Sequence, residues 1–254
     1  MTKLSDHWGA FLAAVTFYTR IPIPKLWHHR VTKDTLERSA PWLPWLGMFI
    51  GGCSALVFTL AAEPLGGSLA AILSISCGIL LTGAFHEDGL ADMADGFGGG
   101  WTKAEILRIM KDSTHGSYGV LALILAVLAK IFALTQMGPA KAPWALLACH
   151  SAARSMAITF LATHDYVREE GKAQNATTRL PWKATFWGLI PGILGLLLVG
   201  WKELLVAIGL LLGLRAYLSR LFTKKIGGYT GDCLGASEQL AEVAILITCV
   251  YFAS

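Results

Sequence analysis

Apolar and polar segments alternate along most of the chain. The apolar segments are roughly 16 to 20 residues long, and a helix needs roughly 20 such residues to cross the hydrocarbon core of a bilayer. The pattern therefore predicts an all-α fold, a polytopic transmembrane helix bundle of about seven spans, with residues 1–254 as a single integral membrane domain. We place the spans near residues 45–62, 68–85, 117–136, 143–162, 185–201, 204–220 and 236–252.

Positive charges are distributed unequally between the loops that these spans define. One set of loops holds only Lys141 and Lys202. Lysine and arginine concentrate in cytoplasmic loops, so we expect the N-terminus to be cytoplasmic and the C-terminus to lie outside. The cytoplasmic set comprises sixteen residues: Lys3, Arg20, Lys25, Arg30, Lys33, Arg38, Lys103, Arg108, Lys111, Arg168, Lys172, Arg179, Lys183, Arg220, Lys224 and Lys225.

The composition agrees with a membrane protein. Hydrophobic residues make up 54% and charged residues 15% of the chain, whereas soluble domains carry roughly 25% charged residues. The net charge of +4 comes largely from the unequal loops, so we expect contact with the lipid bilayer and no nucleic-acid partner. No cleavable signal peptide is evident. Residues His7–Thr19 predict a short interfacial or re-entrant helix, which either covers a cytoplasmic site or only anchors the chain.

Acidic side chains are concentrated in "HEDGLADMADGFGGG", directly after the second predicted span. If that helix continues past Phe85, Asp88, Asp92 and Asp95 lie at spacings of four and three, on one helix face, with His86 on the opposite side. Three like charges on one face repel each other unless a cation neutralises them. The glycines of this segment also allow close approach of backbone or substrate, which a merely solvated acidic loop does not require.

An array of carboxylate oxygens favours Mg²⁺, with Mn²⁺ as the alternative. Because Mg²⁺ commonly completes its coordination with substrate phosphates, the cluster predicts phosphoryl chemistry. Two further cytoplasmic loops carry matching residues: "IMKDSTHGSYG" contains Lys111 and Asp112, and "KKIGGYTGDCLGASEQLAE" contains Asp232 between glycines. Glycine-rich turns at a helix start can bind phosphate. The alternative is that each turn is only an ordinary helix start, with Asp112 or Asp232 as its cap.

Charged residues within predicted spans are functional candidates by default. Arg154 lies inside the fourth span and Arg215 near the cytoplasmic end of the sixth. Arginine binds phosphate in bidentate fashion, and Arg154 is also suited to balance the carboxylates. We expect Lys130, toward the opposite face, to extend its amine to the membrane surface.

Four segments together resemble the signature blocks of the cobalamin synthase family, also called adenosylcobinamide-GDP ribazoletransferases. They are "FYTRIPIP", "HEDGLADMADGFGG", "IMKDSTHGSYG" and "GGYTGDCLGASEQLAE", in this order, and the resemblance spans residues 11–242. The resemblance implies a Mg²⁺-dependent enzyme of the bacterial inner membrane, with its active site toward the cytoplasm. Its substrates would be adenosylcobinamide-GDP and α-ribazole or α-ribazole 5′-phosphate, and its products GMP and adenosylcobalamin or its phosphate. Other membrane enzymes of the pathway are candidate partners.

Under this resemblance each candidate residue has an expected role. The ribazole 3′-hydroxyl attacks the phosphorus attached to cobinamide, and GMP leaves. We predict Asp88, Asp92, Asp95 and Asp232 as metal ligands, with Asp95 preferred over His86 as the general base. The residues expected to bind substrate are Arg154 and Lys111, which also act on the reacting phosphate, together with Asp112, Asp232 and Arg215.

Two other functions use similar residues. A CDP-alcohol phosphotransferase also has an aspartate-rich, glycine-containing motif, but its motif carries an arginine soon after the first Asp-Gly, and here none occurs between Asp88 and Arg108. A cation transporter is less favoured, because transporters often show repeated halves and place acidic ligands near the bilayer midplane. In this sequence the acidic residues gather at one membrane face.

Overall fold

A computed structural model describes residues 2–114, 116–167 and 179–253, with side chains from residue 7 onward. The described residues form helices and no β-strand, which confirms the predicted all-α class. The helices are α1 (Thr2–Tyr18), α2 (Lys33–Glu37), α3 (Leu43–Leu65), α4 (Gly67–Thr82), α5 (Phe85–Gly99), α6 (Lys103–Ile109), α7 (Ser117–Thr163), α8 (Trp182–Val199), α9 (Trp201–Ile226) and α10 (Gly231–Tyr251), with 3-10 turns at Lys25–Arg30 and Ala40–Trp42.

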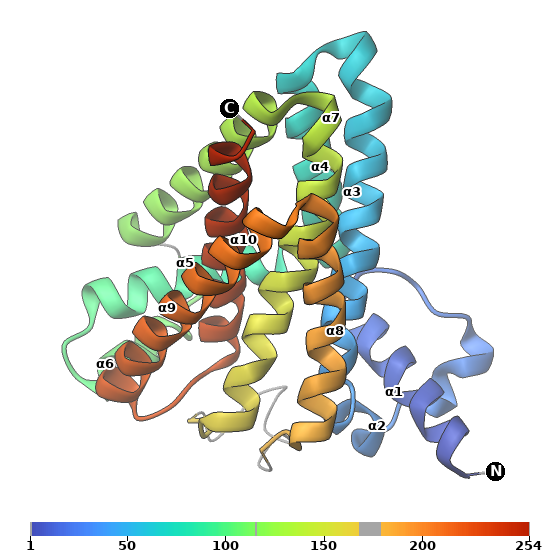
Figure 1. Cartoon of the computed structure of the whole chain (residues 1–254). Helices are drawn as coiled ribbons and strands as arrows, with labels where there is room; N and C mark the ends of the chain where they lie inside the picture. The colour runs from blue at the N-terminus through green and yellow to red at the C-terminus, as the bar shows by residue number, and fades with distance from the viewer. Residues whose placement is uncertain (1, 115, 168–178, 254) are drawn as a thin grey trace.

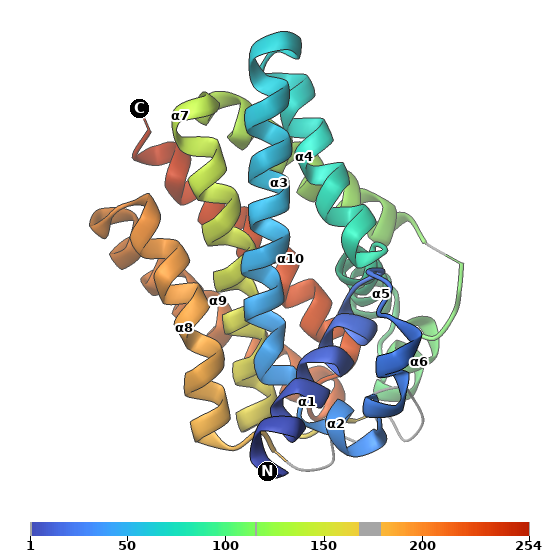
Figure 2. The ribbon, with the colours of Figure 1, turned by 90° about the vertical axis from the view of Figure 1, so that its right-hand side faces the viewer.

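Helix α7 lies at the centre of the bundle and packs against α3, α8 and α10 (Figures 1 and 2). It is 47 residues long and is interrupted at Gly138, whose φ of 66° is accessible to glycine at little cost. The interruption divides α7 into two arms that coincide with the predicted spans 117–136 and 143–162. Small residues such as Ala145, Ala148 and Ala152 are fully or nearly fully buried on the second arm, so neighbouring helices approach its backbone closely.

Within the part of the chain that the structure describes, five helical segments are long and apolar enough to cross a membrane: residues 40–65, which include α3, and the helices α7, α8, α9 and α10. Helices α4 and α5 together form a sixth candidate that is bent by 89°. The observed helices overlap all seven predicted spans when the two arms of α7 are considered separately. The number of crossings stays a prediction, but the apolar helices agree with an integral membrane protein.

The second predicted span does not continue as a straight helix past Phe85, contrary to the condition considered from the sequence. Helix α4 ends at Thr82, and both Gly83 and Ala84 adopt left-handed backbone conformations before α5 begins. The side chain of Arg20 occupies the space where a Cβ atom of Gly83 would lie, and the Arg20 N–H donates to the carbonyl of Leu81 at 2.7 Å. Arg20 therefore closes the end of α4, and α5 starts in a new direction.

The two chain ends lie at opposite ends of the bundle, as an odd number of spans requires (Figures 1 and 2). Lys141, from the sparsely charged loop set, donates to the carbonyl of Phe252 beside the C-terminus. Helix α1 confirms the predicted N-terminal helix and packs at the other end, against α2 and α3. Arg168 and Lys172 of the cytoplasmic set lie outside the described residues.

Candidate active site

Helix α5 carries all three aspartates of the acidic cluster, so their predicted spacing within one helix is retained. Asp88 is exposed, Asp92 is half-buried and Asp95 is buried. The fourth predicted ligand, Asp232, lies in the first turn of α10. A Cβ atom on Gly89 would lie 3.0 Å from the Cα atom of Asp232, so the absence of a side chain brings the two helices together. The backbone of Asp232 thus lies against α5 at Gly89, the residue after Asp88.

The Asp95 carboxylate caps the start of α7. Its two oxygens accept the N–H groups of Gly116 and Gly119 at 2.7 and 2.9 Å. These are N–H groups at a helix N-terminus, which have no partner inside the helix. A side chain on either glycine would collide with the carboxylate. Its predicted roles as ligand and base stay predictions, and both compete with these two hydrogen bonds.

The donor chemistry of Asp88, Asp92 and Asp232 fits Mg²⁺, which prefers carboxylate oxygens and often takes only one or two of them from the protein. Among the described residues, no three histidine, cysteine or acidic side chains are placed to hold a metal ion by themselves. An ion held here would therefore need oxygen ligands from elsewhere, such as water and phosphate. The aspartates thus fit a site that substrate completes, and not a closed protein cage.

A second charged cluster is buried between α5, α7 and α10. Arg154 is only 1% exposed, and its guanidinium lies 2.9 Å from the Glu242 carboxylate and 3.5 Å from that of Glu238. Lys130 is also buried and donates to Glu242 and Gln239. The expectation that Lys130 extends to the membrane surface is therefore wrong. Buried charges require such partners, because each loses its hydration.

Arg154 balances carboxylates, as expected, but the carboxylates are those of α10 and not the aspartates of α5. Its predicted contact with phosphate stays a prediction. The guanidinium also lies 3.3 Å from Nδ1 of His86. Because a guanidinium only donates, Nδ1 must accept and the imidazole hydrogen must be on Nε2. That nitrogen lies 2.9 Å from Glu238. Both nitrogens of His86 are therefore engaged, which competes with a role as base.

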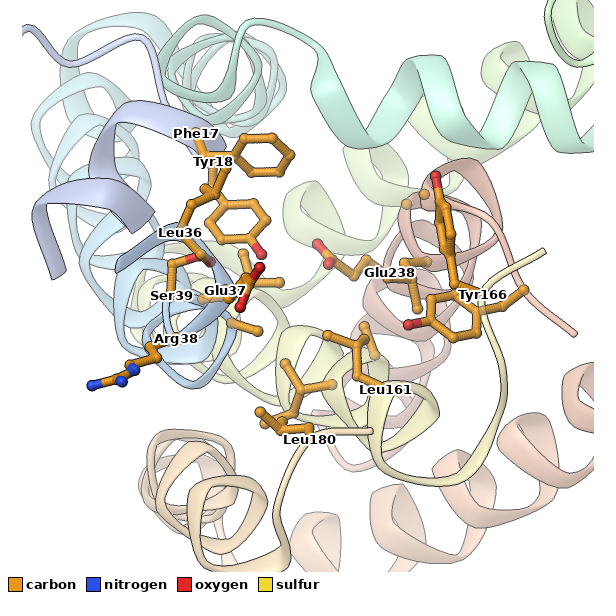
Figure 3. A pocket seen from close by; sticks show the side chains of 18 of the residues that line it. Phe17, Tyr18, Leu36, Glu37, Arg38, Ser39, Leu161, Tyr166, Leu180 and Glu238 are labelled. Carbon is orange, nitrogen blue, oxygen red and sulfur yellow. The ribbon is translucent and has the colours of Figure 1, made fainter. Parts of the chain in front are cut away.

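A cavity of about 310 Å³ opens between α1, α2, α5, α7 and α10 (Figure 3). Its wall is mostly apolar, and Figure 3 shows Phe17 and Tyr18 of α1 on one side and Tyr166 on another, with the Glu238 side chain between them. Helix α1 thus forms one wall of this cavity, and its role as the cover of a functional site stays a prediction. The remaining lining residues are Leu36, Glu37, Arg38, Ser39, Ala40, Leu43, Phe85, His86, Ala157, Ile158, Leu161, Arg179, Leu180, Pro181, Tyr229, Gly231, Leu234 and Gly235.

The cavity adjoins the aspartate-bearing face of α5. Phe85 lines the cavity, and Asp88 and Asp92 follow it at spacings of three and seven, on the same helix face. Gly231, at the start of α10, lines the cavity directly before Asp232. The N-terminus of α10 is therefore beside both features, and the positive end of its helix dipole favours an anion there.

The phenols of the cavity wall are poor proton donors and acceptors near neutral pH. Burial raises the pKa of Tyr18 to about 12. Burial also raises the pKa of Tyr229, and the neighbouring Tyr166 adds to that shift. The neutral phenols of Tyr18 and Tyr229 therefore contribute an amphipathic surface and hydrogen bonding rather than charge.

Three other predicted residues lie apart from the cavity lining. Lys111 and Asp112 are exposed between α6 and α7, and Asp112 accepts hydrogen bonds from Thr114, which lower its pKa. Arg215 of α9 reaches α7, where it donates to Thr159 and Thr163. Their predicted roles in substrate binding stay predictions.

The sequence-based prediction missed Glu238 and Glu242. They are four residues apart in "SEQLAE", at the start of an apolar segment. Acidic residues in a predicted span indicate function by default, so the signal was present. It was hidden because the predicted span begins at residue 236 and the pair resembles a polar helix end.

The sequence model of the cobalamin-5-phosphate synthase family matches residues 10–250. The chain is 42% identical over 250 residues to an adenosylcobinamide-GDP ribazoletransferase of Ralstonia pickettii, covering 97% of this chain and 96% of the relative. It is also 42% identical to the enzyme of that name from Shewanella pealeana, over 96% and 95% of the two chains. No solved structure matches significantly. The chain belongs to the cobalamin-5-phosphate synthase family.

Proposed function

We propose that this protein is an adenosylcobinamide-GDP ribazoletransferase, which acts late in cobalamin biosynthesis. The observation that carries the proposal is the 42% identity to relatives of that name across nearly the whole of both chains. The reaction joins adenosylcobinamide-GDP to α-ribazole, or to its 5′-phosphate, and releases GMP. The arrangement of aspartates beside a ligand-sized cavity supports it, because the reaction needs one site for a diphosphate and another for a nucleoside.

The proposed location is the bacterial inner membrane, with the site facing the cytoplasm. Helix α1, whose residues Phe17 and Tyr18 line the cavity, lies at the end of the bundle opposite the C-terminus (Figure 1). Both substrates carry polar nucleotide or nucleoside groups, so a cytoplasmic opening suits their delivery. Association with other membrane enzymes of the pathway is part of this proposal.

The aspartates have a defined place in the proposed reaction. Asp88 and Asp92, with Asp232 across the contact between α5 and α10, would hold Mg²⁺, with Mn²⁺ as a substitute. The metal would supply neutralisation of diphosphate charge and stabilisation of the leaving phosphate. The chain itself orients the reactants: the glycine contact fixes α10 against α5, and the start of α10 presents N–H groups beside Asp232. Such positioning accounts for much of the catalysis in phosphoryl transfer.

The test is GMP release by detergent-purified protein given adenosylcobinamide-GDP and α-ribazole, with Mg²⁺ and with EDTA. We expect GMP and adenosylcobalamin only when the metal is present. α-Ribazole 5′-phosphate in parallel establishes which acceptor is preferred. Folded protein that exchanges CDP-alcohols, or conducts cations in vesicles, without making GMP would overturn the proposal.

A further inference from the structure

The cavity contains a buried carboxylate without a conventional hydrogen-bond donor. Glu238 is 1% exposed and lines the cavity from α10. Among the described residues, no group donates a hydrogen bond of normal geometry to its carboxylate, and Oε2 is a buried atom without such a partner. This oxygen lies 2.9 Å from Nε2 of His86 and 3.5 Å from Nε of Arg154. Because the Glu238 side chain also lines the cavity (Figure 3), a ligand there that donates a hydrogen bond would lie beside this carboxylate.

The size and wall of the cavity restrict that ligand. A volume of about 310 Å³ accommodates a nucleoside, whereas a corrinoid is several times larger. The wall is formed mainly by aromatic and aliphatic side chains such as Phe17, Tyr18 and Leu161. Flat aromatic bases bind between such side chains, and the hydroxyl groups of a sugar require polar partners. The chemical class that fits is therefore a nucleoside with an apolar aromatic base.

We propose that this cavity binds the α-ribazole acceptor and that Glu238 is a catalytic residue that receives the proton of its attacking hydroxyl. This inference rests on the proposed function and adds the acceptor site and the base to it. The hydroxyl oxygen forms a bond to the phosphorus attached to cobinamide. The bond from that phosphorus to the bridging oxygen breaks, GMP keeps the electron pair, and the hydroxyl proton moves to Glu238.

The surroundings of Glu238 suit this role. Nε2 of His86 and the Arg154 guanidinium lie beside the carboxylate and orient it, as a second residue orients the base in other enzymes. Phe85 places the start of the α5 aspartate face at the cavity wall. An acceptor in the cavity therefore lies next to the proposed diphosphate site. Asp95 and His86 have no comparable accepting group directed into the cavity.

The first test separates binding from catalysis. Glu238→Gln should lower kcat by about 100-fold or more, the range for loss of a general base, while adenosylcobinamide-GDP binds with unchanged affinity. Glu203→Gln is the matched control, because Glu203 is also a buried glutamate but lies near Lys141, away from the cavity. Glu238→Asp, which keeps the charge beside Arg154, serves if Glu238→Gln does not fold. Wild-type kcat in folded Glu238→Gln, or in folded Glu238→Asp when Glu238→Gln does not fold, would overturn the assignment.

The second test fills the cavity. Leu161→Trp should raise the KM for α-ribazole at least 10-fold and weaken α-ribazole binding in calorimetry, without changing the Kd of adenosylcobinamide-GDP. Leu125→Trp, on an exposed part of α7, is the control for the added side chain. An unchanged KM, or an effect on adenosylcobinamide-GDP alone, would overturn the acceptor site. Wild-type protein that makes no GMP would instead contradict the proposed function itself.

Discussion

Helices α5 and α10 each carry acidic residues toward the proposed site, but the two groups are neutralised in different ways. Glu238 and Glu242 of α10 are buried and contact cations of the protein, Arg154 and Lys130. On α5, Asp88 is exposed, and no ion pair of Asp88 with a protein cation is found among the described residues. The protein thus balances the charge inside the bundle and leaves acidic charge at its surface.

The buried carboxylates of α10 need their partners for the stability of the fold, whereas the exposed carboxylates of α5 are available for a function. Carboxylates enclosed by helices must have partners from the chain, because desolvation is unfavourable without them. Carboxylates on an open face tolerate water, so their spacing is free to serve an external cation. The comparison predicts that removing Asp88 or Asp92 from α5 affects activity, whereas removing Lys130 from the buried cluster affects stability.

The largest effect on activity is expected for the aspartates Asp88 and Asp92 of α5. Replacing Asp88 or Asp92 with Ala should lower turnover by more than about 1,000-fold, since metal-assisted charge neutralisation would be lost. Membrane insertion should stay intact in both variants, and the melting temperature of the Asp88 variant in detergent should stay unchanged, because Asp88 is exposed. GMP release at several Mg²⁺ concentrations is the measurement. Normal Mg²⁺-dependent activity in either variant would refute the metal assignment.

The buried cluster should respond in the opposite manner. Lys130→Met leaves Glu242 with one cation fewer inside the bundle, and loss of one partner of a buried pair costs about 3–5 kcal/mol. We expect a clearly lower melting temperature in detergent. Lys202→Met, at an exposed position of α9, is the matched control. Equal melting temperatures for the two variants would mean that the Lys130 pair does not stabilise the fold.

Sequence patterns predicted the helices well, because a long apolar segment by itself indicates a helix that is buried in lipid or protein. The spacing of Asp88 and Asp92 was equally readable, since it depends only on a local helix. The bend at Gly83 and Ala84 was not, because it depends on Arg20, which lies more than sixty residues earlier. The cavity likewise depends on side chains of α1, α7 and α10, which come from distant parts of the sequence, and no local pattern encodes such an arrangement.

Asp95 shares one property with each of the two groups. It lies on α5 with Asp88 and Asp92, but it is buried like the charged residues around Arg154. Asp95→Asn removes the charge and one of two acceptors at the start of α7, so we expect a loss of about 1–2 kcal/mol in stability. Activity at a temperature where the variant is folded should fall much less than in Asp92→Asn. If folded Asp95→Asn is as inactive as Asp92→Asn, Asp95 acts as a ligand or base after all.

The smallest effect is expected at the cavity rim, where Arg179 is exposed and pairs with Asp165 at 3.1 Å. An arginine beside the acceptor cavity favours a phosphorylated acceptor, but water screens an exposed charge, which limits the gain to about 1 kcal/mol or less. Arg179→Gln should therefore raise the KM for α-ribazole 5′-phosphate by roughly threefold to fivefold and leave the KM for α-ribazole unchanged. Lys183→Gln, another exposed cation just beyond the cavity lining, is the control. Equal changes for both acceptors would show that Arg179 does not contact the phosphate, and the preference between acceptors would then have to arise deeper in the cavity.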